Sequence, residues 1–371
     1  MQLRKHQQRF LDQNPDKALL CWDCRTGKTL PASIWGKNRG TRGVIVCPKQ
    51  GVEDWRRYSP EATVLSKEQF KKCWQSIEKP TSLIIDECHT TASGLFTRLR
   101  SQLSSAVYNF IRRYPDLPIL LLSATPITNN PASLHTLLCY LGRYIPWEKW
   151  RARFYVLQKR PYLPRPAWFP KEGWQKDIRI VLEKYADIVS LKDCVDYLPP
   201  VTKDIIPVKT PKYIKDVTKP WTHEHMHEQS KKIDYIKSMR YRKIIIACHY
   251  TAQIDEMQKE LSKVRQTFVL DGRTKKPDEV KRMAQEADEC YFIVQSSMGY
   301  GWDGFSFGCL VFASLSHKAL DHFQMMGRLI NVDNPKPLFY EYLVGGRIDR
   351  KILDCIEANN DFNPHILNES A

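Results

Sequence analysis

The chain has 371 residues and a formal net charge of +16 at pH 7. This length suits two domains, each with a buried core. Hydrophobic residues make up 42% of the sequence and charged residues 26%, which excludes a largely disordered protein. Apolar runs such as Ile119–Leu122 are far too short to cross a bilayer, and the polar amino terminus lacks the apolar segment of a secretion signal. We therefore expect an intracellular, cytoplasmic protein with no membrane partner, located in the host cytoplasm if a phage encodes it.

The charged residues and the cysteines narrow the class of protein. The 57 Lys and Arg residues outnumber the 41 Asp and Glu residues, which fits a polyanionic partner such as nucleic acid and equally a solvated basic surface. Eleven scattered cysteines indicate reduced thiols rather than a disulfide framework. Cys21 and Cys24 have the spacing of half a zinc site, but no second pair completes it, so we do not expect zinc there.

Short apolar runs alternate with helical patterns along the chain and form two series. The first series is 18–22, 44–47, 83–85 and 119–122, and the second is 244–248, 268–270, 292–294, 310–313 and 338–343. Buried runs separated by helices predict two parallel α/β sheets covered by helices on both faces. Ligands bind at the carboxyl ends of such strands, where the chemically suggestive residues of this chain fall.

A basic region separates the two series. Residues 143–243 contain 23 Lys and Arg residues and 12 Asp and Glu residues. The stretch 160–171 combines prolines, basic residues and aromatic residues, and its prolines exclude a regular helix or central strand. It could act as a wedge or clamp with Trp168 or Phe169 stacked on bases, or pack over the first domain, and we favour the packed alternative.

A candidate phosphate-binding loop follows the first apolar run. Arg25-Thr26-Gly27-Lys28-Thr29 lies between a strand-like run and a helical stretch, as such a loop requires. Backbone N–H groups would cradle the phosphates of ATP, Lys28 would reach the β- and γ-phosphates, and the Thr29 hydroxyl would bind Mg²⁺. Trp22 stands where the usual G-x-x-x-x-G-K-T pattern begins with glycine, and a chance Gly-Lys-Thr loop is the alternative.

Two further strand ends carry polar residues. Asp86 is a candidate Mg²⁺ ligand, and Glu87 is a candidate base that orients and deprotonates the attacking water. The alternative is that these acids only cap the next helix. Ser123 and Thr125 end the following run, where they would sense phosphate, couple the domains or simply form a turn.

Taken together and in this order, the GKT, DECH and SAT segments resemble motifs I, II and III of the superfamily 2 helicases and translocases. Pro126–Asn130 and Leu198–Asp204 are similar to the T-P-x-x-N-N and L-P-P-K-T-E segments of the Swi/Snf-type DNA translocase branch. The resemblance covers nearly the whole chain. It implies an α/β fold with two RecA-like P-loop lobes, whose parallel sheets are flanked by helices. We expect an ATP-binding lobe 1 at 1–142, an insertion and linker at 143–230, and lobe 2 at 231–371.

The resemblance also implies roles for individual residues. In lobe 1, Gln7 would read the adenine, Lys49, Ser66 and Thr125 would contact nucleic acid, and His89 and Ser123 would couple the lobes. In lobe 2 the matching residues are His249, Arg273 and Ser297 for nucleic acid, Gly301 and Asp303 for the nucleotide, Gln324 for coupling and Arg328 for catalysis. ATP would be hydrolysed in the cleft between the lobes, with the catalytic set Lys28, Asp86, Glu87 and Arg328.

The main departure from the family pattern lies in motif VI. Gln324–Arg328 resembles Q-x-x-G-R, but the second family arginine is Asn331 in this chain. An arginine finger can be worth 10³–10⁵ in rate, so a slow, regulated or inactive ATPase is an alternative. His223, His225 and His227 alternate as H-x-H-x-H, where we favour a solvated segment over a metal site.

Three functions follow from these observations. The first is an ATP-driven, Mg²⁺-dependent translocase or helicase that acts on duplex, forked or branched DNA, mainly through phosphate contacts, with a recruiting protein as a further partner. The second is an RNA helicase, because DECH also occurs in members that sense duplex RNA. The third is a nucleotide-binding scaffold on nucleic acid, which only Asn331 favours.

Overall fold

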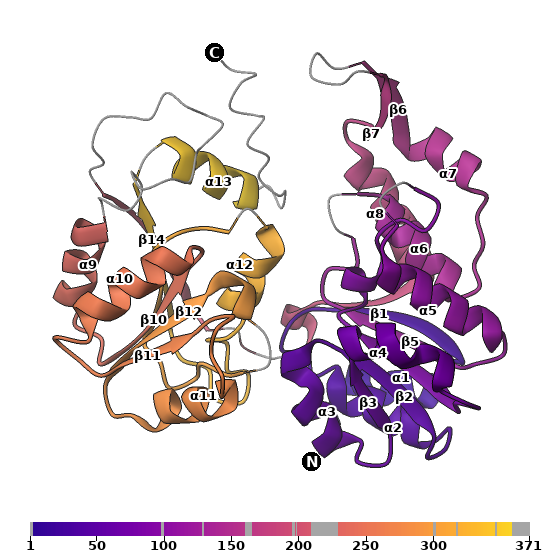
Figure 1. Cartoon of the computed structure of the whole chain (residues 1–371), viewed down its shortest axis with the longest axis horizontal. Coiled ribbons are helices and arrows are strands. Elements are labelled where there is room, and N and C mark those ends of the chain that lie inside the picture. Colours follow the sequence, from indigo (N-terminus) through magenta and orange to yellow (C-terminus); the bar gives the residue numbers. More distant parts are fainter. Residues whose placement is uncertain are drawn as a thin grey trace. The chain divides into compact units, whose positions relative to one another are not determined.

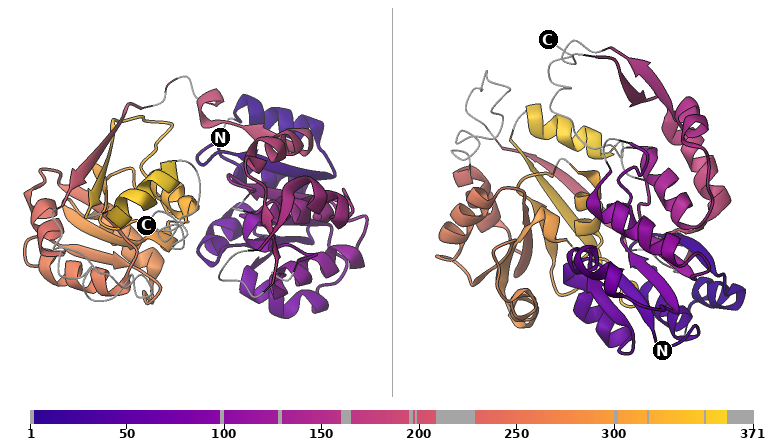
Figure 2. Two further views of the ribbon diagram at one scale, coloured as in Figure 1. Left: turned by 90° about the horizontal axis from the view of Figure 1, so that it is seen from above. Right: turned by 45° about the vertical axis from the view of Figure 1, so that its right-hand side comes forward.

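The computed structural model describes residues 3–97, 100–127, 130–159, 165–194, 197, 199–208, 229–299, 302–316, 318–345 and 347–357. The chain divides into two compact units, Met1–Asp196 and Tyr197–Ala371. Each unit is built on one six-stranded sheet (Figures 1 and 2).

The sheet of unit 1 is entirely parallel, in the order β3-β2-β4-β5-β1-β8. Its strands are β1 (Lys17–Trp22), β2 (Gly43–Cys47), β3 (Thr63–Ser66), β4 (Ser82–Asp86), β5 (Ile119–Ser123) and β8 (Ala186–Val189). Its helices are α1 (Lys5–Gln13), α2 (Thr29–Lys37), α3 (Val52–Tyr58), α4 (Lys67–Cys73), α5 (Gln102–Arg113), α6 (Ala132–Tyr140), α7 (Trp147–Phe154) and α8 (Trp174–Tyr185). A separate antiparallel hairpin joins β6 (Tyr155–Gln158) to β7 (Ala167–Pro170).

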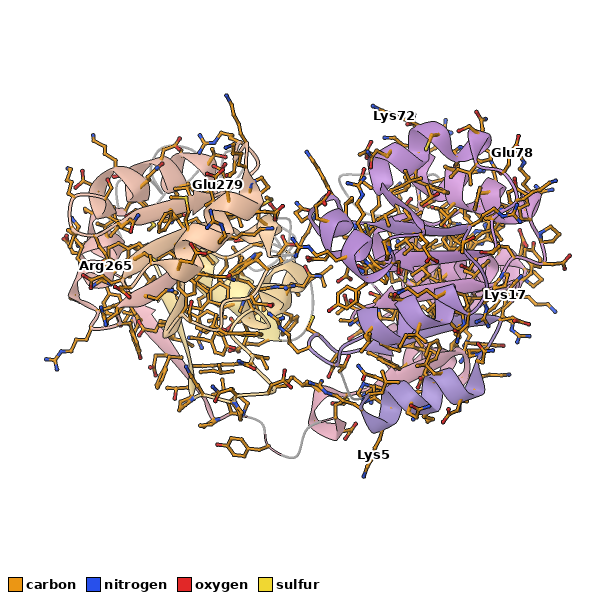
Figure 3. All side chains as sticks on the ribbon, turned by 90° about the horizontal axis from the view of Figure 1, so that it is seen from below. Lys5, Lys17, Lys72, Glu78, Arg265 and Glu279 are labelled. Carbon is orange, nitrogen blue, oxygen red and sulfur yellow. The ribbon has the colours of Figure 1, made fainter. Side chains whose placement is uncertain are left out.

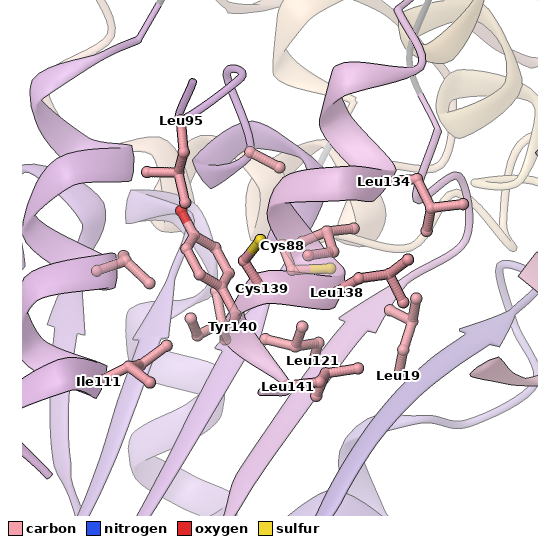
Figure 4. Close-up of a cluster of buried hydrophobic side chains, with 14 of the residues drawn as sticks. Leu19, Cys88, Leu95, Ile111, Leu121, Leu134, Leu138, Cys139, Tyr140 and Leu141 are labelled. Atoms are coloured by element: carbon pink, nitrogen blue, oxygen red, sulfur yellow. The ribbon is translucent and has the colours of Figure 1, made fainter. Parts of the chain in front are cut away.

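Both faces of this sheet are buried, which explains why its strands are continuous apolar runs. Leu83 and Ile85 of β4 pack into one core, and Ile84 between them packs into the other. The first core lies under α5 and α6, where Tyr140 and Leu138 lie beside Leu121 (Figure 4). Polar and charged side chains such as Lys5 and Lys72 extend outward from the helices (Figure 3).

The sheet of unit 2 is also parallel, in the order β11-β12-β10-β13-β14-β9. Its strands are β9 (Val201–Pro207), β10 (Lys243–Cys248), β11 (Thr267–Leu270), β12 (Cys290–Gln295), β13 (Cys309–Phe312) and β14 (Leu338–Val344). Its helices are α9 (Gln229–Ser238), α10 (Thr251–Leu261), α11 (Pro277–Glu286), α12 (Ala319–Met326) and α13 (Arg347–Glu357). Neighbouring residues of β10 alternate between two cores, with Ile245 in one and Ile244 and Ile246 in the other.

The nine predicted apolar runs are all strands, and the predicted fold class of two parallel α/β sheets is confirmed. The boundaries of the units differ from the expected ones. The region 143–230 does not form one separate insertion, because β8 joins the first sheet beside β1 and β9 joins the second beside β14. Helices α7 and α8 also contribute to the core of unit 1, through Trp150, Phe154 and Ile178.

Candidate functional site

The loop after β1 is shaped by the two elements that flank it. Trp22, at the position of the missing glycine, is the last residue of β1 and is fully buried. Its ring packs edge-on against His6, with centroids 4.7 Å apart, and against Phe10. Trp22 therefore belongs to the core, and the loop is the short segment 23–28 between β1 and α2.

Lys28 and Thr29 lie where α2 begins. The Lys28 amino group donates hydrogen bonds to the carbonyl oxygens of Trp22 (2.5 Å) and Asp23 (3.1 Å), so it is held at the end of β1. Thr29 is the first residue of α2, and backbone N–H groups at such a helix start attract anions. Gly27 has a φ of +82°, a conformation that favours glycine.

Helix α1 holds this loop through consecutive backbone carbonyls. Arg4, which precedes the helix, and two residues of its first turn contact three carbonyl oxygens: Arg4 Nη1 reaches that of Arg25 (3.1 Å), His6 Nε2 that of Thr26 (2.9 Å) and Gln7 Nε2 that of Gly27 (2.9 Å). A Cβ at Gly27 would come within 2.6 Å of the Gln7 amide nitrogen. The predicted adenine-reading Gln7 is therefore in contact with the predicted phosphate loop.

Asp86 ends β4 with both carboxylate oxygens hydrogen bonded. Trp55 of α3 donates its indole N–H to Oδ2 (3.0 Å), and the backbone N–H of Glu87 donates to Oδ1 (3.0 Å). Burial, and next the charge of Glu87, raise the pKa of Asp86. A carboxylate in this setting gains from a cation, which fits the predicted Mg²⁺ ligand.

Glu87 has the left-handed backbone conformation, with a φ of +47°. The Lys67 amino group donates a hydrogen bond to the Glu87 carbonyl oxygen (3.0 Å), and burial lowers the pKa of Lys67. Sequence reasoning missed this role of Lys67 and the contact of Trp55 with Asp86. Trp55 follows the end of β2, and Lys67 follows the end of β3. Both strands lie on the same side of β4 in the sheet, and this placement is the only signal that could have predicted the two contacts.

His89 links the ends of two neighbouring strands. Its Nδ1 lies 2.9 Å from the Ser123 hydroxyl at the end of β5 and 3.4 Å from the Glu87 carboxylate. Ser123 also accepts a hydrogen bond from the backbone N–H of Thr125 (3.1 Å). The structure thus brings together the residues predicted for catalysis and coupling in unit 1.

The residues predicted to bind nucleic acid in unit 1 differ in accessibility. Lys49 is exposed, in the single turn η1 (Lys49–Gly51). Ser66 is buried, and its hydroxyl caps α4 by accepting the N–H of Gln69 (3.2 Å). Lys49 is therefore free to meet a phosphate, whereas Ser66 already has a structural role.

In unit 2 the predicted nucleic-acid contacts lie on separate strand ends. The His249 backbone N–H donates to the Ser314 hydroxyl (2.7 Å), and Ser297 is exposed in η6 (Ser296–Met298). Arg273 makes close ion pairs with Asp255 and Asp271, at 2.6 Å each. Two carboxylates thus already neutralise the Arg273 charge that was predicted to meet a phosphate.

The motif VI residues lie near α12. Gln324 is 1% exposed, and neither of its amide atoms has a hydrogen-bond partner among the described residues. Arg328 donates to the Trp302 carbonyl oxygen (2.8 Å), and the Asp303 carbonyl oxygen accepts from Gln285 (2.5 Å). Gly301 lies outside the described residues, so its predicted nucleotide contact stays a prediction.

Asn331 has a local structural role. Its side-chain oxygen accepts the backbone N–H groups of Asp333 (3.0 Å) and Asn334 (3.1 Å), which closes a turn after α12. An arginine at this position could not accept these bonds. Asn331, which stands where the family has arginine, therefore suits the turn that the backbone makes here.

Cys21 and Cys24 are free thiols, and within the described part of the chain no group of His, Cys, Asp and Glu residues is arranged to hold a metal ion. The H-x-H-x-H segment, Gly301, the outer part of 160–171 and residues 128, 129 and 198 lie outside the described residues. In the part that is described, no helix is long and apolar enough to span a membrane.

Comparison with known proteins found similar solved structures but no match by sequence. No family model and no curated protein matches the sequence. Among solved structures, a Saccharomyces cerevisiae Dbp5 variant bound to a Gle1 variant and IP6 matches with a TM-score of 0.56 at 14% identity, covering 96% of this chain and 86% of that chain. The Sulfolobus solfataricus SWI2/SNF2 ATPase core in complex with dsDNA matches with a TM-score of 0.43 at 12% identity, covering 96% and 91%.

The likeness to Dbp5 spans both units, because it covers 96% of this chain. The chain therefore shares with the Dbp5 structure a fold of two α/β units, each built on one parallel six-stranded sheet.

Proposed function

We propose that this protein is an ATP-dependent nucleic-acid translocase or helicase that acts on duplex, forked or branched DNA. The observation that carries the proposal is the grouping of Lys28, Asp86, Glu87, His89 and Ser123 at the carboxyl edge of one parallel sheet. Such an edge is where α/β proteins bind ligands. The T-P-x-x-N-N and L-P-P resemblances favour DNA.

The residues of unit 1 fit ATP and Mg²⁺. Asp86 has a raised pKa, so a nearby cation would stabilise its ionised form, and Thr29 supplies a hydroxyl at the start of α2. We propose that Asp86 and Thr29 hold Mg²⁺, which when bound neutralises charge on the phosphates. Lys28 leaves the carbonyls of Trp22 and Asp23 to contact the phosphates of ATP.

Each protein group proposed to act at the phosphates has its own role. Glu87 accepts the proton of the attacking water, and His89 keeps its carboxylate oriented. His89 also contacts the Ser123 hydroxyl. A change in the position of the Glu87 carboxylate would therefore move the end of β5 and the segment that follows it. The motif VI resemblance favours Arg328 as the catalytic arginine, whose charge would stabilise the transferred phosphate. Phosphate contacts through residues such as Lys49 give little sequence preference and strong salt dependence.

ATP turnover with different polymers tests the proposal. We expect duplex or forked DNA to stimulate turnover at low salt more than single-stranded DNA or duplex RNA, and Lys28→Ala to abolish the stimulated rate. Lys37→Ala, an exposed lysine at the other end of the same helix, is the matched control and should behave as wild type. Stimulation by RNA alone would replace DNA by RNA as the substrate.

A second function is favoured by one observation, the turn that Asn331 closes in place of a second motif VI arginine. In that case the protein binds nucleotide and nucleic acid with little or no turnover. Nucleotide binding that no polymer converts into turnover would support this scaffold over the motor.

A further inference from the structure

A projecting arm of unit 1 has no part in the function proposed above. It consists of α7 and the β6–β7 hairpin, and the hairpin extends from the rest of the unit beyond α8 (Figures 1 and 2). The base of the arm is firmly packed, because Trp150, Phe154 and Tyr155 are buried in the core of the unit. These three residues precede the 160–171 region, whose expected packing over unit 1 is not seen at Arg165 and Trp168, which are exposed; residues 160–164 lie outside the described part of the chain.

The outer part of the hairpin exposes apolar side chains. Leu157 of β6 pairs directly with Trp168 of β7, so both lie on one face of the hairpin. Leu157 is 52% exposed and Trp168 is 45% exposed. The Arg151 guanidinium of α7 lies 4.7 Å from the centre of the Trp168 ring and fixes its position. An aromatic ring held in this way and left open to solvent is a platform for a planar partner.

Positive charge surrounds the platform. Residues 147–171 contain seven Lys and Arg residues and one acidic residue, Glu148. Arg153, Lys159 and Arg165 are exposed, and none of the three forms an ion pair with another described residue. A second copy of the chain, with a net charge of +16, would repel this surface, whereas a polyanion would be attracted to it.

We propose that the arm binds single-stranded nucleic acid, with a base stacked on Trp168 beside Leu157 and phosphates on the surrounding Arg and Lys side chains. A single strand is required because a stacking partner must be an unstacked base, which a duplex does not offer. Exposed basic residues supply the phosphate contacts. The arm would hold the strand by affinity alone, so the proposal does not depend on ATP turnover.

Binding of a fluorescent oligothymidylate to the full-length protein without nucleotide tests the proposal. We expect Trp168→Ala to weaken binding roughly 5- to 150-fold, and Trp168→Phe, which keeps an aromatic face, to retain most of it. Binding of a blunt duplex should change far less. Ile180→Ala, which removes another exposed apolar side chain of unit 1, is the control and should bind as wild type.

The charges are tested by the double variant Arg153→Gln with Lys159→Gln. The slope of log affinity against log salt for the single strand should become shallower by about 1.4, at about 0.7 per lost contact. Lys37→Gln with Lys72→Gln removes two exposed lysines elsewhere on unit 1, of which Lys72 is labelled in Figure 3, and should leave the slope unchanged.

Three results would overturn the proposal. The first is wild-type single-strand affinity in both Trp168→Ala and the double arm variant. The second is a loss of single-strand affinity that is as large in Trp168→Phe as in Trp168→Ala, or a loss of duplex affinity in Trp168→Ala as large as its loss of single-strand affinity. The third is a dimer in light scattering that Trp168→Ala dissociates, which would make a second copy the occupant. Because ATP turnover is not measured, failure here is distinct from failure of the proposed motor function.

Discussion

The two units have sheets of the same kind, yet their strand-end residues are used differently. In unit 1 the ends of β4 and β5 carry side chains that contact one another, as His89 contacts both Ser123 and Glu87. In unit 2 the corresponding residues are held by their own surroundings, as Arg273 is by two carboxylates. A parallel sheet therefore provides a place for a site, but neighbouring side chains decide whether the site is assembled there.

This difference suggests that the polar residues of unit 1 serve catalysis and that those of unit 2 serve stability. In the proposed function, Lys28, Asp86 and Glu87 of unit 1 bind and hydrolyse ATP, whereas Arg328 of unit 2 donates a hydrogen bond to the Trp302 carbonyl oxygen. Changes in unit 1 should therefore affect chemistry strongly with little effect on stability. Changes at the corresponding positions of unit 2 should affect stability first.

Glu87→Gln should have the largest effect. The amide cannot accept the proton of the attacking water, so we expect turnover to fall by roughly 10²–10⁴ while nucleotide binding remains. Single-turnover hydrolysis and nucleotide binding would be measured in parallel. Glu68→Gln, an exposed acid on α4, is the control, and a Glu87→Gln enzyme with normal turnover would show that unit 1 is not the catalytic site.

Trp55→Phe should have the next largest effect. It keeps the buried ring but removes the N–H that orients Asp86. Loss of a group that orients a metal ligand usually costs 10–100-fold, so we expect a turnover defect that high Mg²⁺ partly restores. Trp74→Phe, at a half-buried tryptophan with no such bond, is the control. A loss that Mg²⁺ does not change would assign Trp55 to packing alone.

The central strands were the part of the fold that sequence predicted best, because strands buried on both faces are continuous apolar runs. Strands β3, β8 and β9 were missed, and each forms an edge of its sheet. Strand β9 shows the reason, since its residues Val201–Pro207 are almost all exposed and include Lys203 and Asp204. Edge strands bury less surface, so their sequences show less of the continuous apolar run that marks a central strand.

Within the site, the sequence predicted residues at a strand end or in the loop after it, such as Asp86 and Lys28. It could not predict the contacts of Trp55 and Lys67, because these depend on where α3 and α4 direct their side chains. The turn closed by Asn331 was likewise missed, since a departure from a family pattern does not reveal the local bonds that replace it.

The pH dependence of stability tests whether the polar residues of unit 2 are structural. Burial, and next the charge of Lys203, lower the pKa of His322 to about 3. Between about pH 3 and the ordinary value of 6.5 the unfolded chain therefore binds the extra proton, so stability falls as the pH falls. His322→Phe should make the free energy of unfolding less steep in pH, by up to about 1.4 kcal/mol per pH unit.

Denaturant unfolding of wild type and His322→Phe between pH 4 and 7 measures this slope. The pKa values of His6 and His135 are also lowered by burial, but both residues are present in the two proteins, so the difference reports His322. Equal slopes would mean that His322 gains a proton in the folded state as readily as in the unfolded chain.

Asn331→Arg should have the smallest effect and bears most directly on the comparison. If unit 2 only lacks a catalytic arginine, the substitution raises turnover. We expect instead no gain in turnover and a loss of about 1 kcal/mol in the free energy of unfolding, because the N–H groups of Asp333 and Asn334 lose their acceptor. Asn331→Asp keeps an acceptor oxygen and should retain most of the stability. Faster turnover in Asn331→Arg with unchanged stability would show that Asn331 limits catalysis rather than shaping the turn.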